Sequence, residues 1–551
     1  MPPSSSELRG ARHLVVAWAL LALLLGCTAP DGSVAPASDP TRSAPASSAP
    51  ASSAPASPAP AAPAPDSDAR VVDTPSEATD TPPLVTVPEP LPPVPPGRDA
   101  LIARLSPLVG AAAEFSSEGT VAVLVTDEHG REVVGSDADT SVMPASTQKL
   151  LTAAAVLVTL GPDGRLRTHL ETTGPIGPDG VLEGEVVVVG AGDPTLVTDE
   201  YARWIYPARP RTPLEDLADA LVEAGVRVIA GDVVADVSGF VGDARAEGWQ
   251  DNYFHDLDAR YVSGLTVDAG LETLITLPEP DEAEEDDDSD EGQEPAPAVP
   301  DVRVQLVPDP ALHTVRELER VLEERGVRVE GEPRVGEPTA PPVGRLVTVH
   351  SPPMHEVLRF AVQRSDNHLS DQLFLVVGRL RTGEGSWPRG ERGLRQVLDH
   401  LGVDHTGARF ADGSGLSRDD RVTPRLLVEL DRAMLAGRHA DTWRSLMAVM
   451  GESGTLSERM RGTVAVGRFV GKTGTLRDVT ALSGAVLEGD EPRFHLAVLA
   501  NDPGGGRWAA RVLMDELILA LVAEVDGCEI RTLEGIDATP LGVPPSTVSC
   551  P

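Results

Sequence analysis

The hydrophobic pattern near both ends of the central region of the chain predicts β-strands. Apolar runs over residues 121–126 and 131–134 flank the polar turn 127–130, which is typical of a hairpin. Further strands are predicted over residues 468–475, 480–487 and 495–501. Strands at both ends of a region with helices between them indicate an antiparallel sheet covered by helices, which is an α/β fold class.

Longer apolar segments between these strands predict the helices. Residues 146–160 are rich in Leu and Ala and end at Gly161-Pro162, a dipeptide that stops a helix. Further helices are predicted over residues 356–364 and 369–380, and a closing helix is predicted over 508–522, after the last strand. The tripeptide 365–367 is therefore expected in a loop between two helices.

Residues 167–342 have a different composition, which is rich in Val, Gly and Pro. They contain short strand-like runs at 185–189 and 226–237. We interpret them as an inserted, largely β module. The module contains the acidic segment 278–301, which has twelve Asp or Glu residues and no basic residue. A solvated, disordered loop is the favoured interpretation of this segment, and weak binding of a divalent cation is the alternative.

The N-terminal residues 1–27 have the pattern of an export signal. Arg9 and Arg12 precede an apolar run over residues 14–25, which is short for a membrane span. The run ends at Cys27 in a sequence similar to a bacterial lipobox, so we expect lipidation of Cys27, with cleavage without lipidation as the alternative. Residues 28–98 are almost entirely Ala, Pro, Ser, Thr and Asp, which predicts a disordered tether. These features predict an exported, membrane-anchored protein of the cell envelope.

Length and charge narrow the possible classes of protein. Residues 99–527 are too many for one compact core, so we expect one domain formed by 99–166 and 343–527 that the module 167–342 interrupts. The formal net charge of −39 argues against a nucleic-acid-binding surface. The tail 528–551 holds Cys528 and Cys550, which form either a disulfide or two free thiols.

Lysine occurs at only two positions, Lys149 and Lys472, which leaves 44 arginines among the 46 basic residues. A lysine amine can be desolvated and lose its proton, whereas arginine stays protonated. Lys149 follows Ser146 by three residues, so the two side chains share one face of the predicted helix. A desolvated amine beside a hydroxyl group can remove its proton, which is the serine–lysine form of nucleophile activation.

The tripeptide Ser365-Asp366-Asn367 is the second candidate motif. In a loop beside a cleft, Ser365 would relay a proton to a leaving amine, and Asn367 would hold a substrate amide. The alternative for this tripeptide is a Ser-Asp pair that caps a helix.

The third candidate motif contains the other lysine, in the strand pattern Lys472-Thr473-Gly474-Thr475. Lys472 and Thr473 are expected to bind a substrate carboxylate, and Gly474 is expected to let the substrate backbone approach closely. The backbone N–H group of Thr475, together with that of Ser146, would form an oxyanion hole.

In this order, the three motifs resemble the S-x-x-K, S-D-N and K-T-G set of penicillin-recognising serine enzymes. The 219 residues from Ser146 to Ser365 make the chain similar to the D-alanyl-D-alanine carboxypeptidase/endopeptidase family of class C low-molecular-mass penicillin-binding proteins (penicillin-binding protein 4-like, peptidase family S13), which carries an insertion between these motifs. Further similar segments are residues 190–195, 236–240, 263–267 and 412–418.

The resemblance implies a transpeptidase fold like that of penicillin-binding proteins and β-lactamases, and a Ser146 acyl-enzyme formed with peptidoglycan stem peptides or β-lactams. It implies no cofactor, and the twelve histidines show no metal-ligand spacing. By position, Arg418 and Asp236 are candidates for a subsite that binds a diaminopimelate side chain, with a structural role as the alternative.

Two other classes of function remain open. A β-lactamase or esterase on the same fold would need fast deacylation. A non-catalytic envelope protein would only bind cell-wall peptides, and the three intact motifs argue against it.

Overall fold

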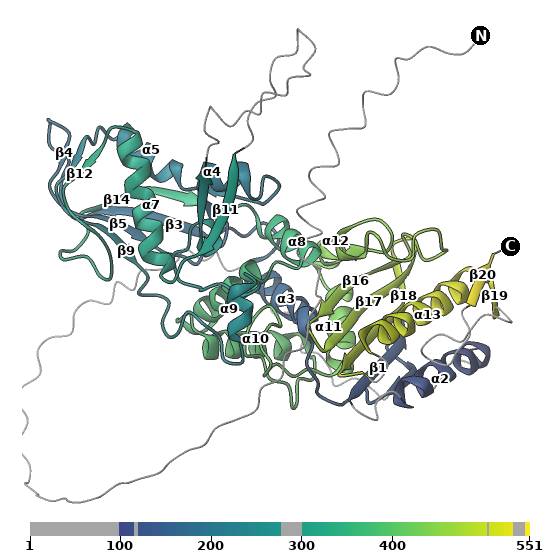
Figure 1. Cartoon of the computed structure of the whole chain (residues 1–551). Helices are drawn as coiled ribbons and strands as arrows, with labels where there is room; N and C mark the ends of the chain where they lie inside the picture. The colour runs from purple at the N-terminus through teal and green to yellow at the C-terminus, as the bar shows by residue number, and fades with distance from the viewer. Residues whose placement is uncertain (1–97, 115–118, 277–299, 504–505, 533–545, 551) are drawn as a thin grey trace, which may run out of the picture. The chain divides into compact units, whose positions relative to one another are not determined.

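The computed structural model describes residues 98–114, 119–276, 300–503, 506–532 and 546–550 (Figure 1). The predicted export signal with Cys27, the tether up to residue 97 and residues 278–299 of the acidic segment lie outside the described residues. Among the helices that are described, none is both long and apolar enough to cross a membrane.

A six-stranded antiparallel sheet in the order β15-β16-β17-β18-β1-β2 forms the main domain. Its strands are β1 (Thr120–Asp127), β2 (Glu132–Ser136), β15 (Ala448–Val449), β16 (Phe469–Thr475), β17 (Val479–Glu488) and β18 (Glu491–Asn501). Strand β1 pairs with β18 over its whole length, from Thr120 opposite Asn501 to Asp127 opposite Phe494. The strands expected near the two ends of the central region therefore lie in one sheet.

Both faces of this sheet are buried. In β1, Val121, Val123 and Val125 pack into the core that contains α2 (Asp99–Glu114) and α13 (Gly506–Asp526). Ala122 and Leu124 point to the opposite face, because successive residues of a strand alternate, and they join the core around α3.

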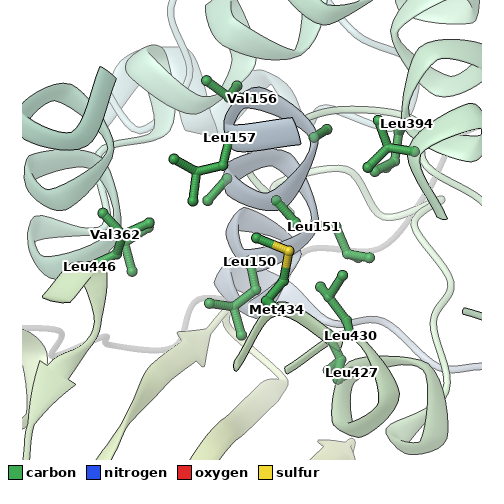
Figure 2. Packing of buried hydrophobic residues seen from close by; sticks show 14 of the residues in the cluster. Leu150, Leu151, Val156, Leu157, Val362, Leu394, Leu427, Leu430, Met434 and Leu446 are labelled. Atoms are coloured by element: carbon green, nitrogen blue, oxygen red, sulfur yellow. The ribbon is translucent and has the colours of Figure 1, made fainter. Parts of the chain in front are cut away.

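The second face carries a layer of helices with α3 at its centre. The helices are α3 (Gln148–Leu160), α8 (Met354–Arg364), α9 (Asn367–Thr382), α10 (Trp387–Leu401), α11 (Pro424–Ala436) and α12 (Ala440–Leu446). Figure 2 shows Leu150, Leu151 and Leu157 of α3 among side chains of the neighbouring helices, such as Leu430 and Leu446. Ten of the thirteen residues of α3 are buried, as expected for a helix that is apolar on nearly all sides.

The inserted module contains a mixed five-stranded sheet in the order β13-β9-β5-β3-β14. Its strands are β3 (Arg167–Thr172), β5 (Val186–Val189), β9 (Val233–Asp236), β13 (Pro333–Val335) and β14 (Gly344–His350). Helices α5 (Glu215–Glu223) and α7 (Pro310–Glu324) share its core. Smaller elements are β4 (Val181–Leu182), β6 (Leu196–Val197), α4 (Asp199–Trp204), β7 (Thr212–Pro213), β8 (Val228–Ile229), α6 (Asp251–His255), β10 (Leu271–Thr276), β11 (Asp301–Leu306) and β12 (Arg328–Val329).

The module differs from the sequence prediction in two respects. Strand β14 pairs with β3, so the inserted sheet runs to His350 rather than ending at residue 342. The description as largely β also misses α7, which begins at Pro310 behind the capping side chain of Asp309. Val, Gly and Pro dominate the composition of the segment and hide the helical spacing of Val315, Leu318 and Leu322.

The tail forms a short antiparallel pair, β19 (Glu529–Thr532) and β20 (Ser546–Ser549). A disulfide joins Cys528 to Cys550 next to these strands, so the structure contains the bonded alternative.

Candidate active site

Ser146 lies in a tight turn immediately before the buried helix α3. The turn, Ala145–Thr147, is a 3-10 helix, and α3 begins at Gln148, so Ser146 precedes the α-helix that the sequence predicts to start at this residue. Ala145 has a φ of 47°, a left-handed conformation that costs a non-glycine residue free energy and that recurs at active sites. Gly415 packs so closely that a Cβ atom there would lie 1.9 Å from the Ala145 carbonyl oxygen. The nucleophile candidate therefore sits on a strained turn that its neighbours hold in place.

Lys149 is buried beside Ser146. Its Nζ lies 3.0 Å from Ser146 Oγ, 2.7 Å from Asn367 Oδ1 and 2.7 Å from the Ser414 carbonyl oxygen. Burial lowers the pKa of Lys149 from 10.5 to about 8, although the negative charge of Asp371, and then of other carboxylates, acts in the opposite direction. Part of the amine is therefore neutral near neutral pH, as a general base requires.

The turn 412–418 fixes the carbonyl group that Lys149 contacts. The Asp412 carboxylate is buried and accepts three backbone N–H groups of this turn, at 2.6–3.0 Å. It also accepts the indole N–H of Trp249 from the inserted module at 2.7 Å. Burial and the charge of Asp412 raise the pKa of Asp371 well above its ordinary value. The family resemblance marks this turn, but sequence reasoning assigned neither carboxylate a place beside Lys149.

The second motif occupies the junction of α8 and α9. Ser365 has a φ of 60° and ends α8 in the left-handed conformation. The Asp366 side chain caps α9 by accepting the Leu369 N–H at 2.9 Å. The helix-capping alternative is therefore correct for Asp366, while the flanking Ser365 and Asn367 contact the two lysines.

Asp366 is also held by the inserted module. Arg209 donates to its carboxylate at 2.7 Å and to the Pro194 carbonyl oxygen at 3.1 Å. Burial of Asp366 raises its pKa, but Arg209 and Arg260 outweigh that effect and bring the pKa to about 2. Burial and the same two positive charges lower the pKa of the neighbouring His368 to about 3, so its imidazole is a weak base. Sequence reasoning missed Arg209.

Asn367 connects the two parts of the chain around Lys149. Its Oδ1 accepts from Lys149, and its Nδ2 donates to the Asp258 carbonyl oxygen of the inserted module at 2.9 Å. Both the oxygen and the nitrogen of the Asn367 amide thus have hydrogen-bond partners within the protein. A substrate amide would have to share or replace one of these contacts.

Lys472 faces the second motif from β16. Its Nζ lies 2.9 Å from Ser365 Oγ and 2.7 Å from the Thr473 carbonyl oxygen. Burial, followed by the positive charge of Lys149, lowers the pKa of Lys472 well below its ordinary value. The two lysines of the chain therefore approach one site from different elements, each beside a serine hydroxyl group.

The rest of the third motif lies at the end of β16. Thr473 Oγ1 contacts Thr455 Oγ1 at 2.8 Å, and Thr475 is exposed at the end of the strand. Gly474 packs against the nucleophile turn, since a Cβ atom there would lie 2.8 Å from the Pro144 carbonyl oxygen and 3.1 Å from Ala145 Cβ. In the structure, Gly474 thus lies against the turn that carries Ser146, whereas the sequence predicted a close approach of the substrate backbone. This contact places the end of β16 next to Ser146.

The two residues proposed for a side-chain subsite belong to different elements of the chain. Arg418 forms a two-contact ion pair with Asp478, three residues beyond Thr475, which places it beside the end of β16. Asp236 ends β9, where its carboxylate accepts the Ser238 N–H at 2.9 Å and its charge acts on Arg379. The assignment of Arg418 and Asp236 to one subsite therefore stays a prediction.

One group of described residues, Asp127, Glu128 and His129 at the turn between β1 and β2, offers ligand atoms within 4.8 Å of one another, close enough to hold a metal ion. Arg131 and Arg98 already pair with the buried Asp127 carboxylate, at 2.6 and 3.4 Å. This charge balance does not call for a metal ion.

The chain is similar to known proteins over most of the described residues. Residues 111–305 and 291–517 match the model of the D-Ala-D-Ala carboxypeptidase 3 (S13) family. The D-alanyl-D-alanine carboxypeptidase of Actinomadura sp. (strain R39) is 30% identical over 484 residues, which cover 78% of this chain and 87% of that protein. The carboxypeptidase DacB of Mycolicibacterium smegmatis is 29% identical over 438 residues, which cover 77% of this chain and 84% of that protein.

Among solved structures, penicillin binding protein 4 (dacB) of Haemophilus influenzae matches with a TM-score of 0.61 at 21% identity, covering 76% of this chain and 99% of that chain. This likeness shows that the fold is shared. The fold class and the family predicted from the three motifs are confirmed. The chain belongs to the D-Ala-D-Ala carboxypeptidase (S13) family of serine peptidases.

Proposed function

We propose that this protein is a penicillin-sensitive D-Ala-D-Ala carboxypeptidase or endopeptidase that acts on peptidoglycan stem peptides through an acyl-enzyme on Ser146. One observation carries the proposal. Lys149 Nζ lies 3.0 Å from Ser146 Oγ, and Lys472 Nζ lies 2.9 Å from Ser365 Oγ. These are the only lysines of the chain, and each is buried beside one hydroxyl group of the site.

In the first half of the reaction, neutral Lys149 removes the Ser146 proton while Oγ attacks the carbonyl carbon of the penultimate D-alanine. The backbone N–H groups of Ser146 and Thr475 receive the developing oxyanion. The C–N bond then breaks, and a proton passes to the leaving amine from Lys149 through the Ser365 hydroxyl group. Water attacks the resulting ester in the second half, with Lys149 again as the base, and releases the shortened peptide.

Lys472 and Thr473 bind the terminal carboxylate of the substrate in this proposal. Burial lowers the pKa of Lys472, and a substrate carboxylate in contact with the amine opposes this effect, because it favours the charged form. Arg418, beside the end of β16, and Asp236, at the end of β9, remain our candidates for a subsite that receives the side chain of a neighbouring stem-peptide residue.

We also propose that the protein is exported and anchored to a membrane through a lipid on Cys27, with residues 28–98 as the tether. The sequence features that support this are the basic residues Arg9 and Arg12, the apolar run 14–25 and the lipobox-like position of Cys27.

The decisive experiment measures the intact mass of the protein over time with benzylpenicillin, beside Ser146→Ala. We expect a stable adduct of one penicillin that is absent from the variant. An adduct on both proteins would exclude Ser146 as the nucleophile. Rapid loss of penicillin without an adduct would indicate a β-lactamase, and neither an adduct nor turnover would indicate a non-catalytic binding protein.

A further inference from the structure

A hollow of about 480 Å³ lies between the loop 207–211 of the inserted module and the exposed face of α8. Four arginines line it, and the only acidic residue among the lining residues is Glu356. The arginines are Arg209, Arg211, Arg359 and Arg364. In a chain with a formal charge of −39, such a cluster is a local concentration of positive charge. An anion that the rest of the protein repels would be attracted here.

The arginines differ in how far their charges are neutralised. Arg209 is buried and ion-paired with Asp366, and its Nε has no hydrogen-bond partner among the described residues. Arg211 is about half exposed and lies 3.7 Å from Asp199, a contact that solvent weakens. Arg359 and Arg364 are exposed and form no ion pair with any residue in the described ranges. At least two guanidinium groups are therefore available to an incoming ligand.

Aromatic rings give the hollow an apolar wall. Phe360 lines it, Tyr206 packs edge-on against Phe360 with ring centroids 6.3 Å apart, and the Arg209 guanidinium lies 6.0 Å from the Phe360 ring. Tyr206 is 39% exposed, so its ring remains accessible. Arginines beside exposed rings suit a ligand that combines carboxylates with apolar or saccharide groups.

The hollow adjoins the active site through two connections. Arg364 directly precedes Ser365, and Arg359 is six residues from Ser365, or about 9 Å along α8. Gln363, which also lines the hollow, donates to the Met447 carbonyl oxygen at 3.0 Å, and the segment that follows carries Thr455, the partner of Thr473. An extended peptide spans such a distance in about three residues.

We propose that this hollow binds carboxylate groups of the peptidoglycan substrate at a distance from the cleaved bond, through Arg211, Arg359 and Arg364. The proposal rests on the proposed function, because it takes the polymer at Ser146 as the source of the anion. Remote binding of this kind holds a polymeric substrate in place while the reactive carbonyl group reaches the nucleophile.

The experiment measures co-sedimentation of the full-length Ser146→Ala protein with insoluble peptidoglycan from which hydrofluoric acid has removed phosphodiester-linked polymers. Adding Arg211→Gln and Arg359→Gln should weaken binding roughly tenfold, the effect of losing two partly screened contacts. The matched control, Arg316→Gln with Arg392→Gln, removes the same charge from exposed positions outside the hollow and should bind like the parent. Arg211→Lys with Arg359→Lys should retain most of the binding.

Two further arms identify the anion and separate this proposal from the proposed function. Carbodiimide amidation of the peptidoglycan carboxylates should reduce binding to the level of the double Gln variant. If parent and double Gln variant differ in binding to untreated peptidoglycan but bind equally after hydrofluoric acid treatment, the hollow binds a phosphate polymer, and the proposal is overturned. Equal binding by the double Gln variant and its control would also overturn it. Benzylpenicillin acylation, measured with Ser146 present, tests the proposed function alone, since it requires no polymeric substrate.

Discussion

Acylation of Ser146 should depend on pH through a single buried amine. Lys149 must be neutral to remove the Ser146 proton, and burial places its pKa at about 8 rather than 10.5. The group gains its activity as it loses its proton, so the acylation rate should rise with pH. The carboxylates around it, foremost Asp371, oppose the effect of burial and keep the pKa near the physiological range.

The expected size of the effect follows from the pKa. With a pKa of about 8, about one tenth of Lys149 is neutral at pH 7 and about nine tenths at pH 9, so the rate should rise about tenfold between these values. An unperturbed lysine would still be mostly protonated at pH 9, and its rate would continue to rise beyond that pH. The position of the plateau therefore reports the effect of burial.

The assay is the first-order rate of adduct formation at saturating benzylpenicillin, followed by quenched mass measurement from pH 6 to pH 10. Saturation matters because the profile then reports groups that titrate in the complex rather than in the free protein. Lys149→Arg should lower the rate at least about a hundredfold, since arginine does not deprotonate. A flat profile from pH 6.5 to pH 9, or a Lys149→Arg protein with the parental rate, would refute the assignment of Lys149 as the base.

Two other predictions concern contacts around the motifs. Arg209→Met leaves the buried Asp366 carboxylate without the arginine that pairs with it, and it should lower the free energy of unfolding, measured in urea, by about 3–5 kcal/mol. Adding Asp366→Asn to this variant should recover much of the lost stability. Additive effects of the two substitutions on stability would show that the ion pair has no role. Gly474→Ala forces a methyl group to 2.8 Å from the Pro144 carbonyl oxygen and should slow penicillin acylation roughly tenfold to a hundredfold. Gly344→Ala meets no atom within 4 Å and serves as its control, and equal rates for the two variants would contradict the proposed role of close packing.

The sequence contained enough information to predict the elements that carry the motifs, because each motif marks its own local structure. The helices expected around the second motif are α8 and α9, and the break between them is only Ser365 and Asp366. The scarcity of lysine indicated two candidate positions, and the structure places both amines at serine hydroxyl groups of one site.

The contacts that complete the site could not be predicted from local sequence patterns, because they join residues that are far apart in the chain. Arg209 and Asp366 are separated by 157 residues, and Asp258 and Asn367 by 109. No local pattern of hydrophobic and polar residues encodes such a pairing.

These long-range contacts bear on what the inserted module does. If the module were only an appendage, the second motif would be held by α8 and α9 alone. Instead, Arg209 neutralises the Asp366 charge, and the Asp258 carbonyl oxygen accepts from the Asn367 amide. Trp249 adds a third contact by donating to the carboxylate that shapes the turn at Lys149. Because the module supplies a partner to each of these groups, its displacement would leave a buried carboxylate unpaired and the base misplaced, so the arrangement of the two parts is itself a condition for catalysis.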